Sequence, residues 1–213
     1  MVRLLACALV LKVTASVILN YHDYMPPNFA SGFLLGREHY FWAGYHWAFY
    51  LHVTSGPCAL IVGIILMSER FRRRFSIWHR YLGRFQTACV LLLVVPSGGW
   101  MALYTETGAV AGLGFTVLGA VTGVCALLGW RSAVRGRSTE HRRWMSRCFV
   151  LLCSAVVLRL IGGMFAVAGI DGDWTYSLAA WISWLGPLAA FEFIQVGYNA
   201  SEHASDRRPQ PSD

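Results

Sequence analysis

The stretch GAVAGLGFTVLGAVTGVCALLGW, residues 108–130, carries no charged side chain and is long enough to cross a lipid bilayer as one helix. A helix needs about 20 apolar residues to span the hydrocarbon core. Similar runs occur on both sides of it, and the predicted membrane spans are 3–19, 41–67, 80–104, 108–130, 144–170 and 175–199. The sequence therefore predicts an all-α, polytopic membrane helical bundle with about six transmembrane helices.

The overall composition supports a membrane environment. Hydrophobic residues make up 56% of the chain and charged residues only 14%, which leaves too few polar side chains to cover a soluble globule. The net charge is +7, but the arginines cluster in short loops between apolar runs. Such clusters are typical of signals that orient membrane proteins, so the expected partners are the bilayer and its anionic lipids, and not nucleic acid.

The orientation follows from the distribution of arginine among the loops. Residues 69–84 and 131–147 are rich in arginine, whereas the first loop on the other side contains Arg37 alone. Because positive loops stay in the cytoplasm, we expect a bacterial inner (plasma) membrane protein with both termini cytoplasmic. The expected organisation is a single transmembrane domain over 1–200, followed by a polar, proline-containing and disordered cytoplasmic tail over 201–213.

One arrangement occurs twice along the chain. Residues 56–60 and 123–127 both read Gly-x-Cys-Ala-Leu, and each is followed by an arginine-rich loop and a His-Arg pair that opens the next apolar run. The pairs are His79-Arg80 and His141-Arg142. This pattern predicts a pseudo-repeat of the second and third helices with the fourth and fifth, in which the two imidazoles meet near the cytoplasmic face.

A ligand site is therefore predicted from His79, His141 and the arginines nearby, Arg80, Arg84, Arg142 and Arg147. Two opposed histidines would suit the iron of a b-type haem, with arginines binding its propionates. Paired guanidinium groups would equally suit phosphate, a quinone oxygen or a lipid headgroup. The third interpretation is purely structural, because arginines at this depth also pair with anionic lipids without any specific ligand.

Polar side chains inside the predicted spans form a second set of candidates: His52, Lys12, Arg159 and Glu192. A charge at a helix centre costs about 3 kcal/mol on insertion scales, so each needs a partner or water. Lys12 and Glu192 lie at similar depths, which predicts an ion pair joining the first and last helices. Arg159 and His52 lie farther out and could line a polar cavity, so a small-solute transporter is an alternative function.

Proline and glycine interrupt the third predicted span at Pro96, Gly98 and Gly99. Proline removes a backbone hydrogen bond and commonly kinks a helix, which leaves either a pocket or a packed bend. No catalytic triad, phosphate-binding glycine loop or metal-ligand spacing stands out. The sequence accordingly designates no catalytic residue and no metal site, and whether the protein is an enzyme stays open.

Several motifs recur together in a fixed order, and through them the chain resembles an uncharacterised bacterial family of predicted multi-pass membrane proteins with a domain of unknown function. They are His52 with Gly56-Pro57, residues 70–76, residues 79–84, the His-Arg-Arg-Trp-Met stretch 141–147, Leu158-Arg159-Leu160, Tyr176, residues 180–184 and Glu192. The resemblance implies a helical membrane fold and no particular activity. A weaker architectural analogy links the chain to membrane cytochromes of the b561 type, and a non-enzymatic structural or assembly subunit is the remaining alternative.

Overall fold

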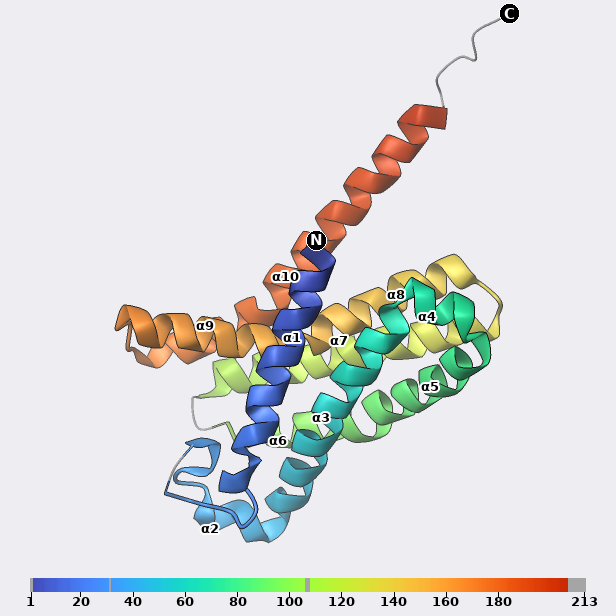
Figure 1. The fold of residues 1–213 in the computed structure, drawn as a ribbon. Coiled ribbons are helices and arrows are strands. Elements are labelled where there is room, and N and C mark those ends of the chain that lie inside the picture. Colours follow the sequence, from blue (N-terminus) through green and yellow to red (C-terminus); the bar gives the residue numbers. More distant parts are fainter. Residues whose placement is uncertain (1, 31, 106–107, 207–213) are drawn as a thin grey trace, which may run out of the picture.

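The structure is a computed structural model that describes residues 2–30, 32–105 and 108–206, and the described chain is built from helices (Figure 1). The long helices are α1 (Val2–Leu19), α3 (His46–Met67), α5 (Ser76–Cys89), α6 (Val95–Leu103), α7 (Ala109–Val134), α8 (Ser138–Leu152), α9 (Ser154–Ala168) and α10 (Asp173–Asp206). Short helices α2 (Glu38–Tyr40) and α4 (Glu69–Arg74) precede α3 and α5.

Six helical segments are long and apolar enough to cross a membrane, and they confirm the predicted six-span bundle. They are Leu5–Asp23, Glu38–Met67, Ser76–Leu103, Ala109–Val134, Ser138–Ala168 and Trp174–Gly197. Alternate connections therefore lie at opposite ends. We call the end with α4 and the α7–α8 turn the basic end, and the end with α2 and the α9–α10 turn the opposite end.

Close backbone approach holds the middle of the bundle together. A Cβ atom added at Gly112 of α7 would lie 2.7 Å from the carbonyl oxygen of Ala102 in α6. One added at Gly129 would lie 2.6 Å from Met145 Sδ in α8. Small residues let membrane helices pack at short distances, and α7 uses them to contact α6 and α8 at its two ends. The main buried cluster lies between these contacts and includes Cys89, Cys125, Ala126, Cys148 and Leu151.

The predicted irregularity in the third span is present. A single π-helical turn, Val90–Val94, separates α5 from α6, and Pro96 stands in the first turn of α6. A proline at this position needs no amide hydrogen, so the wide turn accommodates it. A second break, at Cys153, separates α8 from α9 within the fifth span.

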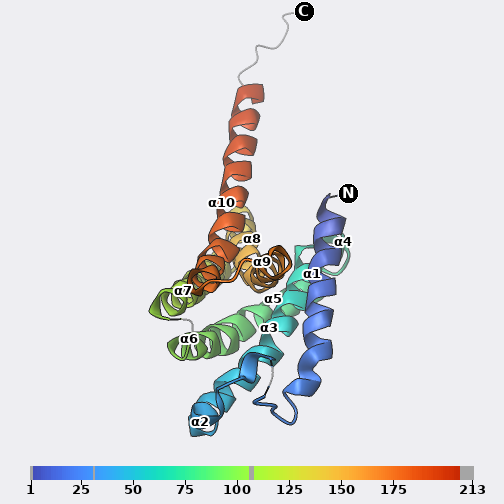
Figure 2. The same ribbon diagram turned by 90° about the vertical axis from the view of Figure 1, so that its left-hand side faces the viewer.

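The last helix, α10, belongs to the bundle over only part of its length. Ala179, Ala180, Ser183 and Trp184 are buried against other helices, whereas Phe193 is 79% exposed. Figures 1 and 2 both show the C-terminal half of α10 standing away from the other helices. The helix continues to Asp206, into the segment where the sequence analysis expects a tail, and 207–213 lie outside the described residues.

Candidate functional site

The two His-Arg pairs adopt the same local structure. Helices α5 and α8 begin at Ser76 and Ser138, and the histidine is the fourth residue of each helix. The backbone N–H of His79 donates to the carbonyl oxygen of Phe75 at 2.9 Å, and that of His141 donates to Arg137 at 2.9 Å. Each imidazole is therefore fixed in the first turn of a helix that starts at the basic end.

The two predicted histidines lie within electrostatic range of each other, and His79 is also within range of Arg72. His141 Nδ1 is 2.9 Å from the carbonyl oxygen of Gly129, so Nδ1 carries the hydrogen and Nε2 is left as the acceptor. His79 Nδ1 is buried and has no hydrogen-bond partner among the described residues. A buried polar atom without a partner is unfavourable, so this nitrogen is suited to an added group.

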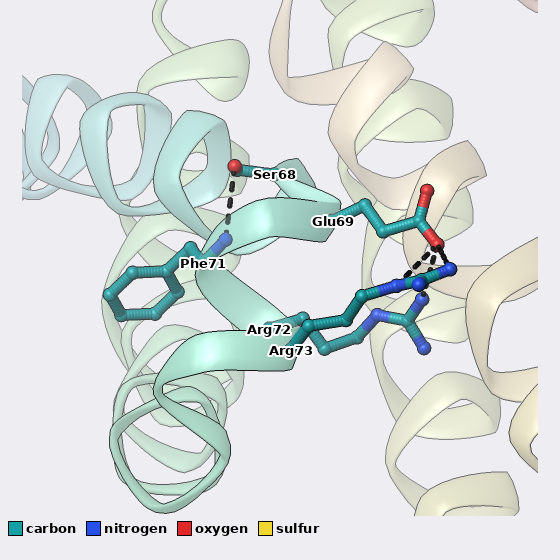
Figure 3. A network of polar contacts seen from close by, with 5 residues as sticks. All are labelled: Ser68, Glu69, Phe71, Arg72 and Arg73. Atoms are coloured by element: carbon teal, nitrogen blue, oxygen red, sulfur yellow. Dashed lines mark hydrogen bonds and ion pairs between the residues drawn. The ribbon is translucent and has the colours of Figure 1, made fainter.

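Helix α4 adds charged groups that the sequence analysis did not single out. The Ser68 hydroxyl caps α4 by accepting from the N–H of Phe71 at 3.3 Å, and Glu69 pairs with Arg73 at 2.6 Å and Arg72 at 3.4 Å. Figure 3 shows Glu69, Arg72 and Arg73 projecting together on the side of α4 away from Phe71. The sequence does contain a pattern that could have identified this helix: a serine, then an acidic residue, then arginines. This order is typical of a short helix with an N-cap.

Arg142 of α8 also interacts electrostatically with Glu69. Hydrogen bonding from Arg73 is the largest effect that lowers the pKa of the Glu69 carboxyl, and Arg142 of α8 contributes to the same shift. The carboxylate therefore stays ionised below the usual range of glutamate, and its interaction with Arg73 is lost only as the pH falls through that lowered pKa. We call His79, His141, Arg72, Arg142 and Glu69 the His/Arg cluster.

The remaining predicted arginines are not among the groups that shift the pKa of His79 or of Glu69. Arg80 is exposed, and Arg84 is exposed with its guanidinium 6.0 Å from the centre of the Tyr81 ring. Arg147 binds Glu192 of α10 through two hydrogen bonds, Nε to Oε1 at 2.5 Å and Nη2 to Oε2 at 2.9 Å. Arg147 also lies over the Trp144 ring at 4.8 Å, so its charge serves the contact between α8 and α10.

The predicted Lys12–Glu192 ion pair is wrong. Glu192 is occupied by Arg147, and Lys12 is exposed with no ion pair to any residue that the structure describes. The physical reason is lateral position: α1 contacts α3 and α9, whereas α10 packs on α7, α8 and α9. The depth of Lys12 in its helix gave no information about which helix lies beside it.

His52 lies in the N-terminal half of α3 and points at the irregular part of the third span. Its Nδ1 is 3.1 Å from the Ser97 hydroxyl, which itself donates to the carbonyl oxygen of Leu93 at 2.5 Å. Arg159 of α9 lies within electrostatic range of His52. The ring packs on Gly98, where an added Cβ would lie 2.9 Å from His52 Cε1, so the imidazole occupies the room beside the bend.

This contact gives a stability prediction. Changing Gly98 to alanine should displace the His52 ring and lower the free energy of unfolding by about 1–2 kcal/mol, as overpacking usually does. Gly99 is the matched control, because an added Cβ there meets no atom within 4 Å. Thermal unfolding of the detergent-solubilised protein should show a lower Tm for Gly98→Ala and an unchanged one for Gly99→Ala. Equal Tm values would contradict the packing of His52 on Gly98.

Six helical segments long and apolar enough to cross a membrane define the chain as a polytopic helical membrane protein. Residues 49–195 match a family model described as "Predicted membrane protein (DUF2306)", where DUF stands for domain of unknown function. The match covers more than half of the chain, so the protein belongs to this family. It spans His52, the His/Arg cluster, Arg159 and Glu192. No curated protein and no solved structure matches the chain.

Proposed function

We propose that this protein binds a ligand bearing a phosphate group at the His/Arg cluster, with the headgroup of an anionic lipid as the natural source. The observation that carries the proposal is the ring nitrogen of His79, which is buried and has no partner among the described residues. Two equivalent His-Arg helix starts, with His141 and Arg72 within electrostatic range of His79, support it. The proposal includes the orientation: the basic end faces the cytoplasm of a bacterial cell, and both termini lie on that side of the plasma membrane.

The chemistry of the cluster favours an oxyanion. Guanidinium groups bind phosphate oxygens through two parallel hydrogen bonds, and imidazole nitrogens can add one donor each when protonated. Helices α5 and α8 both begin at the His/Arg cluster. The N–H groups and the partial positive charge of a helix N-terminus also favour an anion. Glu69 is the acidic member, and it is already bound by Arg72 and Arg73. The cytoplasmic leaflet supplies anionic phosphates at this depth.

The test is lipid binding by the purified full chain in a non-ionic detergent, with dioleoyl phosphatidylglycerol and inorganic phosphate as separate probes. Native mass spectrometry should show retained phosphatidylglycerol for the wild type. The variants His79→Ala and Arg142→Gln should each bind about tenfold more weakly, since one charged hydrogen bond contributes about 1.5–3 kcal/mol. Arg135→Gln, an exposed arginine at the end of α7, is the control and should bind normally.

Two outcomes of that test decide the source of the phosphate. If inorganic phosphate competes at concentrations similar to the lipid, the ligand is a soluble phosphate compound and the lipid assignment fails. If His79→Ala and Arg142→Gln both bind phosphatidylglycerol as the wild type does, the lipid interacts with the surface generally and the proposed site is wrong.

Haem is the second candidate, and one specific observation favours it. The Nδ1 of His141 bonds to a backbone carbonyl and leaves Nε2 free, which is the arrangement usual for a metal-ligating histidine. His79 would be the other histidine that holds the iron. Purified protein with added haemin should then show a sharp Soret band that His79→Ala and His141→Ala each remove. A wild-type preparation that gains no such band would exclude haem.

A further inference from the structure

Gln86 of α5 is a buried amide with only one of its two ends hydrogen-bonded. The residue is 3% exposed and lies within the third span. Its Nε2 donates to the carbonyl oxygen of Ala59 in α3 at 2.9 Å, which fixes the orientation of the amide group. The other end, Oε1, is buried and has no hydrogen-bond partner among the described residues. An amide oxygen in this state is unfavourable, particularly within a membrane span, where lipid supplies no donor.

A small internal cavity lies beside this amide, between α3, α5 and α8. Its volume is about 10 Å³. Besides Gln86, its lining includes Gly63 and Met67 of α3 and Met145 and Cys148 of α8. The surrounding helices are in close contact, because a Cβ atom added at Gly63 would lie 2.7 Å from the ring of Phe149. The cavity is therefore a defined space in a tightly packed region, and its size is close to the minimum that holds one water molecule.

The cavity joins equivalent positions of the two repeated hairpins. Gln86 follows His79 by seven residues, and Cys148 follows His141 by the same number. Seven residues are nearly two helical turns, so each cavity residue lies on the same helix face as its histidine, about 10 Å farther along the axis. Both Gln86 and Cys148 line the cavity. A second pair of polar side chains thus lies deeper in the bundle than the two histidines, on the same faces of α5 and α8.

The cavity can exchange water with the solution at the basic end. Met67, one of its lining residues, is the last residue of α3 and is 40% exposed. The next residue, Ser68, is the N-cap of α4 at the basic end. A methionine side chain has three rotatable bonds and adapts its shape readily, so it can admit a molecule as small as water.

We propose that this cavity is a binding site for one water molecule, which donates a hydrogen bond to Gln86 Oε1 and bridges α5 to α8. A buried water needs two to four polar partners. The amide oxygen is a strong acceptor, the Cys148 thiol is a weak donor, and the Met145 thioether is a weak acceptor. The cavity is too small for a larger ligand. The site shares no residue with the His/Arg cluster and does not depend on phosphate binding there.

The test uses the full chain in lipid bilayers, with glutamine labelled with ¹⁵N in its side chain. Magic-angle-spinning NMR then measures the transfer of magnetisation from water to the side-chain amides. The chain contains three glutamines, Gln86, Gln195 and Gln210, and the variant Gln86→Met identifies the Gln86 signal by its loss. In the wild type, the Gln86 amide should receive magnetisation from water at short mixing times. A Gln86 signal that receives none would show that the cavity is dry and overturn the proposal.

Filling the cavity locates the water. Cys148→Leu adds apolar atoms to the cavity wall, so the transfer to Gln86 should be lost while that to Gln195 should not change. Cys148→Ser, which keeps a small side chain with a donor, should retain the transfer to Gln86. Cys153→Leu is the matched control, because this cysteine belongs to the same span and does not line the cavity. Undiminished transfer in Cys148→Leu would place the water elsewhere and refute the assignment. The wild-type spectrum decides by itself if Cys148→Leu does not fold.

Discussion

Replacing Glu192 by alanine is expected to lower the free energy of unfolding by about 1.5–3 kcal/mol, the usual contribution of hydrogen bonds to a charged group. Arg147 would lose both hydrogen bonds to Glu192 while its side chain stays only 24% exposed inside a membrane span. A charge stripped of its counterion in such a place is destabilising, because neither water nor lipid replaces the carboxylate. Unfolding of the detergent-solubilised protein, followed by circular dichroism, measures the change.

Glu140 provides the control for this variant. It pairs with Arg137 at 3.5 Å in an exposed position at the start of α8, and exposed pairs contribute only about 0–1 kcal/mol. Glu140→Ala should therefore leave the Tm close to that of the wild type. The double variant Arg147→Gln with Glu192→Gln should recover part of the loss, because it removes the unpaired charge. Similar shifts for Glu140→Ala and Glu192→Ala would refute the proposed importance of the α8–α10 ion pair.

Substitution of Gly112 by alanine is expected to destabilise the protein by about 2–3 kcal/mol, at the upper end of overpacking effects. The obstructing atom is the carbonyl oxygen of Ala102, 2.7 Å from the position of the new Cβ, and it belongs to the backbone of α6. A side chain could turn away, but here the helices themselves must separate. The expected result is a lower Tm together with increased susceptibility to proteolysis at the α6–α7 connection.

The same helix offers a matched comparison. A Cβ added at Gly119 meets no atom within 4 Å, and alanine is the better helix former in water. Gly119→Ala should thus leave the Tm unchanged or raise it slightly. If Gly112→Ala were equally harmless, α6 and α7 would not approach each other as closely as the structure places them.

The spans could be predicted from the sequence because membrane crossing depends on length and apolar character alone. Residues 108–130 illustrate this, since the uncharged stretch that predicts a span lies within helix α7 but for its first residue. The repeated His-Arg pairs also pointed to equivalent positions, because a local motif at a helix start depends mainly on its own residues. The proximity of His79 to His141 is consistent with that prediction, whereas a bound ligand there is still a proposal.

Neighbour relationships between helices could not be obtained in the same way. Depth along the helices does not distinguish Lys12 from Arg147 as the partner of Glu192. The packing of α8 against α10 places Arg147 beside it. His52 gave a similar difficulty: its depth predicted a polar cavity shared with Arg159, but its hydrogen-bond partner is Ser97, which follows the π-helical turn in another span. Glu69 and Arg72 were hidden in a run of arginines whose short helix depends on one serine cap.

Pro187 lies within α10, three residues after Trp184, which is buried in the bundle. Having no amide hydrogen, it leaves the carbonyl of Ser183 without its helical partner at the point where the helix departs from the bundle. The segment from Pro187 to Asp206 is roughly 30 Å long at the usual rise per residue. A change of about 10° at the proline would move its far end by roughly 5 Å. Arg147 of α8 binds this segment at Glu192, five residues after the proline. A small displacement of α8 would therefore produce a larger displacement at the far end of α10.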